Sequence, residues 1–347
     1  MLKPPATVLV TGASGFVGSH VSLHLLEAGY RVRGTARGHK LELLRKSFES
    51  YSNFEVIEIN DVATNDFSRA MEDVDAVVHV ASPIAGREAP EGTLTGAIEG
   101  TLNVLRHAVK AGVFKVVFTS SWVTTIDPSL RQAFTDVTLT EKSWGNTSRE
   151  DLLVEGRRPL YVYIGSKILA ERAAWDFARQ HKEIDLTTIN PPFVYGKLIK
   201  GLGASLSSNI QIYQLIAGQA GRPLPPQLPP YYCNVYDVAR AHVLALQLPK
   251  LPSDSDVQDK RFIVAGPGVL LWEDAVRVLM EARPVLRDRL PSVEVVPPLP
   301  GPLCKVDTVR AREVLGIKEY RGWQETVLET VDAIVDLENT SMMKPRY

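Results

Sequence analysis

Tyr163 and Lys167 are a pair of side chains suited to proton transfer, because they lie four residues apart in a helical pattern. Residues at this spacing share one face of a helix, with Cβ atoms about 5–6 Å apart. A free phenol has a pKa of about 10, and a neighbouring ammonium favours its ionised form. The pair therefore predicts that Tyr163 exchanges a proton nearer neutral pH and acts as a general acid.

Two adjacent hydroxyls, Ser120 and Ser121, follow an apolar run at residues 113–119 that is typical of a buried strand. Alternation along a strand directs only one of them toward a site at the strand's carboxyl end. We expect Ser121 to face the site, with Ser120 as the alternative. A serine hydroxyl beside Tyr163 stabilises an oxygen that gains negative charge. The predicted catalytic set is therefore Ser121, Tyr163 and Lys167.

Three glycines occur in a turn at residues 11–18, between an apolar run at residues 6–10 and a helical pattern. Glycine lets backbone N–H groups approach phosphates closely, and the following helix directs its positive dipole end at the same charge. The spacing is Gly-x-x-Gly-x-x-Gly rather than the commoner Gly-x-Gly-x-x-Gly, but the flanking elements favour a dinucleotide-binding turn. The residues expected to contact the pyrophosphate are Gly12, Ala13, Ser14, Gly15, Phe16, Val17 and Gly18.

Arg37 follows the next apolar run, residues 31–35, where an NAD-binding protein presents an acidic side chain to the ribose 2′-hydroxyl. A guanidinium there can bind a 2′-phosphate through charge-assisted hydrogen bonds. Lys40 adds a second positive charge. The alternative is that both are solvated surface residues. A base in place of the acid favours NADP over NAD as the cofactor.

Further cofactor contacts are expected at the ends of the later runs, because ligands of an open parallel sheet bind at the carboxyl ends of its strands. Lys167 has a second expected role there, as a hydrogen-bond donor to the nicotinamide ribose beside Tyr163. The other residues concerned are Asp61 and Val62 beside the adenine, and Ala81, Ser82 and Thr119 on the pyrophosphate and nicotinamide side.

Apolar, β-branched runs alternate with helical patterns, which predicts an α/β fold of the Rossmann type with a doubly wound parallel sheet. After about residue 190 proline and glycine become frequent, and a smaller C-terminal substrate lobe is expected. The boundaries are 1–190 for an NADP-binding domain to which 231–265 returns, and 191–230 with 266–347 for the lobe. The predicted strands are 8–10, 31–35, 54–59, 76–80, 113–119, 186–189 and 261–264; the predicted lobe helices are 272–282, 308–315 and 322–337.

Composition narrows the classes of partner. The chain has 347 residues, 45% of them hydrophobic, and its 39 basic and 40 acidic side chains give a net charge of −1. No basic run favours nucleic acid, and no apolar run reaches the length of about 18 residues needed to span a membrane. The two cysteines and seven histidines lack the spacing of a metal site. With no apolar leader before the first strand, we expect a cytoplasmic protein that binds a small molecule and no metal.

These motifs make the chain similar to the extended short-chain dehydrogenases/reductases. Within them it most resembles the branch of dihydroflavonol 4-reductase-like enzymes and fungal NADPH-dependent aldehyde and methylglyoxal reductases. The resemblance covers most of the chain. The segments that carry it are 11–18, 36–37, 61–62, 79–83, 119–121, 141–144, 163–175, 190–196 and 237–242.

The resemblance implies reduction of an aldehyde or ketone with NADPH by a monomer or homodimer. It also implies that Pro191 and Val194 lie beside the nicotinamide and that Ser208 reaches the cofactor from the lobe. The substrate pocket it implies is lined by Ile84, Trp122, Ile126, Leu160 and Phe193. Two alternatives stay open, a sugar-nucleotide epimerase or dehydratase that retains NAD, and a non-catalytic NADP-sensing protein.

Overall fold

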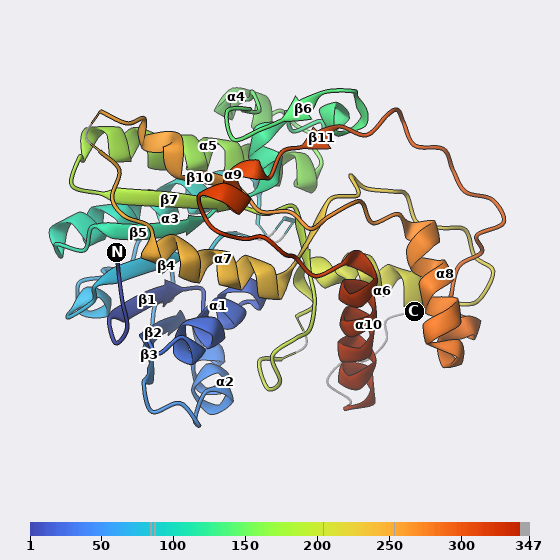
Figure 1. Cartoon of the computed structure of the whole chain (residues 1–347), viewed down its shortest axis with the longest axis horizontal. Helices are drawn as coiled ribbons and strands as arrows, with labels where there is room; N and C mark the ends of the chain where they lie inside the picture. The colour runs from blue at the N-terminus through green and yellow to red at the C-terminus, as the bar shows by residue number, and fades with distance from the viewer. Residues whose placement is uncertain (84, 87, 204, 253, 341–347) are drawn as a thin grey trace.

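The computed structural model describes residues 1–83, 85–86, 88–203, 205–252 and 254–340. At its centre is a seven-stranded parallel sheet with the strand order β10-β7-β5-β4-β1-β2-β3 (Figure 1). In chain order the strands are β1 (Thr7–Thr11), β2 (Arg31–Ala36), β3 (Phe54–Glu58), β4 (Ala76–His79), β5 (Lys115–Thr119), β7 (Asp185–Asn190) and β10 (Arg261–Ile263). Each coincides with a predicted strand, so the predicted Rossmann-type fold class is confirmed.

Helices cover both faces of this sheet. On one face lie α1 (Phe16–Glu27) and α7 (Val235–Gln247), with α2 (Lys40–Ser47) toward the β3 edge. On the other face lie α3 (Pro90–Lys110) and α5 (Pro159–Gln180), which pack against each other. The sheet is therefore shielded from water on both sides, as a doubly wound fold requires.

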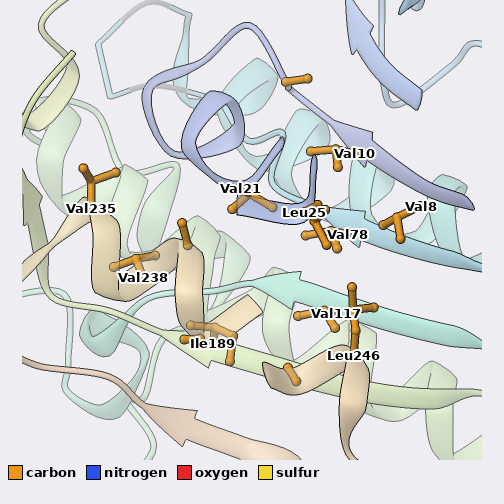
Figure 2. Packing of buried hydrophobic residues seen from close by; sticks show 14 of the residues in the cluster. Val8, Val10, Val21, Leu25, Val78, Val117, Ile189, Val235, Val238 and Leu246 are labelled. Atoms are coloured by element: carbon orange, nitrogen blue, oxygen red, sulfur yellow. The ribbon is translucent and has the colours of Figure 1, made fainter. Parts of the chain in front are cut away.

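Strand β1 shows why its sequence is apolar at consecutive positions. Val8 and Val10 point to the α1 side, where Val21 and Leu25 meet them in one buried cluster (Figure 2). Leu9 points to the opposite face and joins the cluster beneath α3 and α5. Successive side chains of a strand alternate between faces, so a strand covered on both sides needs apolar residues throughout.

The C-terminal part of the chain builds a second core. Buried side chains from α6 (Ile210–Ile216), α8 (Trp272–Ala282) and α10 (Trp323–Asn339) meet in it, away from the large sheet (Figure 1). Strand β8 (Phe193–Tyr195), paired with β9 (Tyr232–Asn234), connects this core to the sheet region. The prediction found α8 and α10 but neither of these short strands.

The remaining elements are short. Strands β6 (Thr138–Leu139) and β11 (Lys305–Val306) pair with each other, and two further α-helices are α4 (Arg149–Leu152) and α9 (Val309–Glu313). The proline-rich segments 221–230 and 297–302 contain neither helix nor strand, as expected of loops. The 3-10 turns are η1 (Arg69–Met71), η2 (Trp122–Thr125), η3 (Arg131–Phe134), η4 (Ser207–Asn209), η5 (Val257–Lys260) and η6 (Pro284–Arg289).

The strand order changes direction at β1, which pairs with β2 on one side and β4 on the other. The connections after β1 and β4 therefore diverge and leave a crevice outside the carboxyl ends of the strands. The backbone of Ala81, after β4, lies very close to Gly12, after β1: a Cβ on Gly12 would be 2.9 Å from the Ala81 Cα. Two of the predicted cofactor positions thus meet at the switch point.

Candidate active site

The glycine turn between β1 and α1 is compact, because its glycines allow the backbone of the turn and of the helix to approach each other closely. Gly12 has a φ of +68°, a conformation that favours glycine. The N–H of Gly15 donates to the Gly12 carbonyl at 2.9 Å. A Cβ on Gly18 would lie only 2.2 Å from that same oxygen. The three spaced glycines therefore let the first turn of α1 sit directly on the turn that follows β1.

The amino end of α1 fits a phosphate group. The N-cap residue is Gly15, which has no side chain to occupy the helix N–H groups, and the first turn of α1 carries no acidic residue. The first N–H groups of a helix have no partners within it, and the helix dipole adds positive potential there. Donor groups and potential at this position suit a pyrophosphate, which is the chemistry that a dinucleotide presents.

Arg37 and Lys40 lie beside this turn at the carboxyl end of β2. The Arg37 side chain is exposed, and the next residue, Gly38, donates its N–H to a carboxylate oxygen of Glu58 at 3.3 Å. Lys40, which begins α2, is half-buried. The structure thus places two cations at this strand end, and their contact with a 2′-phosphate stays a prediction.

Asp61 and Val62 follow β3 in a tight turn. The Asp61 carboxylate accepts hydrogen bonds from the Ala63 N–H at 2.8 Å and from the Thr64 hydroxyl at 2.9 Å. The Val62 carbonyl accepts from Asn103 of α3 at 3.0 Å. Asp61 therefore has a structural task within its own turn, in addition to the cofactor contact predicted for it.

The segment after β4 is held by Thr11. Its hydroxyl accepts from the N–H groups of Val80 and Ala81 at 3.1 and 3.2 Å, and it lies 2.7 Å from the His79 Nδ1. A hydroxyl has one proton to donate, so that proton goes to His79. Burial and the charge of Lys167 lower the pKa of His79 to about 3, so this histidine stays neutral. Ser82, the next predicted contact, is exposed.

Lys167 is buried and points to the end of β5. Its Nζ donates to the Thr119 carbonyl at 3.0 Å and lies 5.0 Å from the centre of the Phe118 ring. Burial lowers the pKa of this ammonium to about 8, although the Glu171 carboxylate acts to raise it. The Thr119 hydroxyl is occupied elsewhere, 2.7 Å from the His242 Nε2.

Tyr163 lies one helical turn before Lys167 on α5 and is half-buried. Burial raises the pKa of its phenol. The prediction that Lys167 lowers this pKa is therefore corrected, because withdrawal from water shifts the pKa in the opposite direction. The phenol is therefore protonated at neutral pH, as it also is at its ordinary pKa of about 10.

The two serines after β5 point in different directions. The Ser120 hydroxyl is buried and donates to the Glu171 carboxylate at 2.7 Å. The Ser121 hydroxyl is half-buried and makes long hydrogen bonds, donating to the Pro191 carbonyl at 3.3 Å and accepting from the Val123 N–H at 3.4 Å. Ser121 is thus the more weakly held of the two hydroxyls, and its role toward a substrate stays a prediction.

The nicotinamide-side residues also come together. Pro191 accepts from Ser121, as described, and the Ser208 hydroxyl of η4 donates a short hydrogen bond to the Val194 carbonyl. Ser208 and Val194 both belong to the predicted substrate lobe, and their contact links η4 to β8.

The predicted substrate pocket is only partly open. Trp122 and Ile126 are 1% and 0% exposed and pack with Tyr231 in a closed apolar cluster, so they are core residues and not open pocket lining. Leu160 is exposed and Phe193 is half-buried, its ring 6.2 Å from that of Tyr195. Ile84 lies outside the described residues.

Sequence reasoning missed a buried group next to the catalytic set. Glu171, four residues after Lys167, is paired with Arg261 of β10 inside the protein. The signal was present, since an acidic residue on the buried face of a helix needs a partner. Within the described ranges, no three His, Cys, Asp or Glu side chains are grouped as a metal would require, and no helix is long and apolar enough to cross a bilayer.

Comparison with known proteins identifies the family. Residues 8–257 match the model of the NAD dependent epimerase/dehydratase family. A ketoreductase of Aspergillus niger, azaE, is 35% identical, with 95% of this chain and 97% of that protein covered. Aldehyde reductase 2 of Sporidiobolus salmonicolor is 30% identical, with 97% of each covered.

A solved structure agrees with this assignment. The yeast methylglyoxal/isovaleraldehyde reductase Gre2, complexed with NADPH, superposes with a TM-score of 0.83 at 27% identity, covering 96% of this chain and 99% of Gre2. The resemblance to fungal carbonyl reductases expected from the motifs is thereby confirmed. The chain belongs to the NAD dependent epimerase/dehydratase family.

Proposed function

We propose that this protein reduces an aldehyde or ketone to the alcohol with NADPH, using Ser121, Tyr163 and Lys167. The observation that carries the proposal is the position of the Lys167 ammonium, 3.0 Å from the Thr119 carbonyl at the end of β5 and one helical turn from Tyr163. Relatives named ketoreductase and aldehyde reductase, and the NADPH complex of Gre2, support the same chemistry.

The cofactor is bound by the turn after β1 and by the cations after β2. Backbone N–H groups at the start of α1 hold the pyrophosphate, and Arg37 with Lys40 selects the 2′-phosphate of NADPH over NADH. Lys167 and Tyr163 face the nicotinamide ribose. When bound, NADPH supplies the hydride that the substrate carbonyl carbon receives.

The side chains complete the reduction at the substrate oxygen. Ser121 and Tyr163 donate hydrogen bonds to it, which stabilises the charge that develops as the carbonyl is reduced. Tyr163 then transfers its proton to that oxygen, and the alcohol forms. The Tyr163 phenol is protonated at neutral pH and therefore carries the proton that this step transfers.

The substrate is a small carbonyl compound with an apolar substituent. Leu160 and Phe193 support this choice, because both are apolar and keep some exposure. Residues 191–230 and 266–347 act as the substrate lobe, and residues 1–190 with 231–265 as the cofactor domain. We also propose that the protein is a cytoplasmic monomer or homodimer; its two cysteines, both free and buried, fit a reducing compartment.

The test is consumption of NADPH by the purified protein with a panel of alkyl and aryl aldehydes and ketones, with NADH at equal concentration as the control. We expect oxidation of NADPH with at least one member and much slower oxidation of NADH. A panel without any oxidation contradicts the proposal and favours a protein that only senses NADP. Tightly retained NAD in the purified protein would favour the epimerase alternative.

A further inference from the structure

Glu171 and Arg261 form an ion pair that is completely shielded from solvent. Both side chains are 0% exposed, and the Arg261 Nε lies 2.8 Å from the Glu171 Oε1. Burying two charges carries a large desolvation penalty, and an apolar pair of similar volume is often at least as stable. Stability alone therefore does not explain why this ion pair is present. Its position near Ser121 suggests a functional role.

The Glu171 carboxylate accepts hydrogen bonds from several side chains that lie around Ser121. Burial would raise its pKa, but Arg261 and the hydroxyl donors around it lower the pKa to about 2, so it stays ionised. Its other donors are the hydroxyls of Ser120 at 2.7 Å, Thr124 at 2.6 Å and Thr188 at 3.1 Å, the Asn190 amide at 2.9 Å and the Trp175 indole at 3.3 Å.

Through these partners the carboxylate holds the backbone of Ser121. The Asn190 amide donates both to Glu171 and, at 3.2 Å, to the Ser121 carbonyl. The Thr124 hydroxyl lies 2.8 Å from the same carbonyl. Ser120 is fixed on one side, and on the other side Trp122 donates its N–H to the Pro191 carbonyl at 2.9 Å. The Ser121 hydroxyl between them makes only long hydrogen bonds, at 3.3 and 3.4 Å.

Arg261 uses all its donors to keep this arrangement in place. Besides Glu171, its guanidinium donates to the Thr124 hydroxyl at 2.8 Å and to the carbonyls of Glu141 and Ser143, both at 2.6 Å. Its flat face lies 3.8 Å from the centre of the Trp144 ring. A guanidinium has five N–H donors in a rigid plane. Because acceptors surround the whole Arg261 guanidinium, its orientation is fixed.

We propose that the Glu171–Arg261 pair is a positioning device for the reaction, which fixes the Ser120–Ser121 segment so that the Ser121 hydroxyl faces the substrate oxygen. This inference rests on the proposed function. Neither residue of the pair contacts the substrate, and the pair acts through Ser121. Correct placement of a donor matters because small displacements of a catalytic group reduce its contribution steeply.

A double-mutant cycle tests this proposal. We expect Glu171→Gln to lower kcat about tenfold or more in the native background, with NADPH affinity measured by fluorescence unchanged. In the Ser121→Ala background the same substitution should change kcat less than about twofold, because the hydroxyl it positions is gone. Equal losses in both backgrounds, or an unchanged kcat in the native background, would overturn the proposal.

Asp185→Asn is the matched control. Asp185, at the opposite end of β7 from Asn190, is paired with Lys115 and Lys260 and is largely buried, so its loss removes a comparable ion pair. It should lower the melting temperature and leave kcat unchanged. Hydrogen–deuterium exchange of residues 119–124 should rise in Glu171→Gln and stay native in Asp185→Asn; exchange that rises equally in both contradicts positioning.

Two outcomes keep the inference separate from the proposed function. If Ser121→Ala itself leaves kcat unchanged, the role of Ser121 fails and the positioning role falls with it, although carbonyl reduction stands. If Glu171→Gln does not fold, Thr188→Val replaces it, since this variant removes one donor to the carboxylate, keeps the ion pair and leaves the contacts of Ser121 in place. A loss of kcat of about threefold that disappears in the Ser121→Ala background is expected; a loss that persists there overturns the proposal.

Discussion

The ammonium of Lys167 donates a hydrogen bond to the carbonyl of Thr119, which ties α5 to the end of β5 at the candidate active site. Lys167 is 3% exposed, so this charge is held away from water. Burial of that kind opposes stability and must be maintained by the rest of the fold. The buried ammonium that the proposed chemistry needs should therefore lower the free energy of unfolding by a measurable amount.

Lys167→Met should abolish turnover but leave the ligand-free protein as stable as the native protein or more stable. Burial lowers the pKa of Lys167 from 10.5 to about 8. Below pH 8 both the folded and the unfolded chain carry the charge, and the folded state bears the full penalty. Between pH 8 and 10.5 the unfolded chain binds more protons, so native stability rises with pH. The advantage of Lys167→Met in melting temperature should thus be largest below pH 8 and shrink above it.

The control for this prediction is Lys115→Met. Lys115 donates to the Asp185 carboxylate at 2.9 Å and to the Leu248 carbonyl at 2.8 Å, so its loss should lower the melting temperature. A Lys167→Met variant that melts several degrees below the native protein at pH 7 would show that the ammonium is stabilising and that the account of its burial is wrong.

Arg37→Ala should weaken NADPH binding without affecting NADH. A charge-assisted hydrogen bond of about 1.5–3 kcal/mol corresponds to a loss in NADPH affinity of about 10- to 100-fold. Arg31→Ala is the matched control, because Arg31 is exposed at the opposite end of the same strand. Fluorescence titration with both nucleotides measures the change. Equal loss of NADPH affinity in both variants, or none in either, would refute the assignment of the 2′-phosphate contact.

Gly18→Ala should lower both stability and NADPH affinity. Its Cβ would lie 2.2 Å from the Gly12 carbonyl oxygen, so α1 has to move away from the turn that binds the pyrophosphate. Gly100→Ala provides the comparison, since a Cβ there meets Val62 at an ordinary 3.6 Å inside α3. That variant should be neutral or stabilised by up to about 1 kcal/mol. Thermal unfolding with and without NADPH distinguishes the two; a Gly18→Ala protein with native affinity would contradict the packing argument.

The sheet was predictable because its central strands are buried on both faces, which leaves continuous apolar runs such as Val8-Leu9-Val10. The glycine turn was predictable for a similar reason, since its backbone geometry admits few other residues. Strands β8 and β9 were missed because each has three residues and no alternation to read. Short elements of this kind form through tertiary contacts rather than local pattern.

The site was harder to predict where side-chain type is ambiguous. Trp122 and Ile126 are apolar, and the sequence alone does not distinguish an apolar pocket residue from a core residue. Their packing against Tyr231 shows that both belong to the core. Glu171 and Arg261 were missed because 90 residues separate them in the chain, so no local spacing connects their charges. The pKa of Tyr163 depends on how much water reaches it, which only the folded chain sets.

Single-turnover reduction by Tyr163→Phe measures the central claim most directly. The substitution removes only the phenolic hydroxyl, so NADPH should bind with native affinity while the rate of carbonyl reduction falls about 100-fold or more. Native NADPH affinity, measured by fluorescence on the same preparation, shows that the site is intact. A Tyr163→Phe protein that reduces the substrate at the native rate would contradict the claim that this phenol delivers the proton.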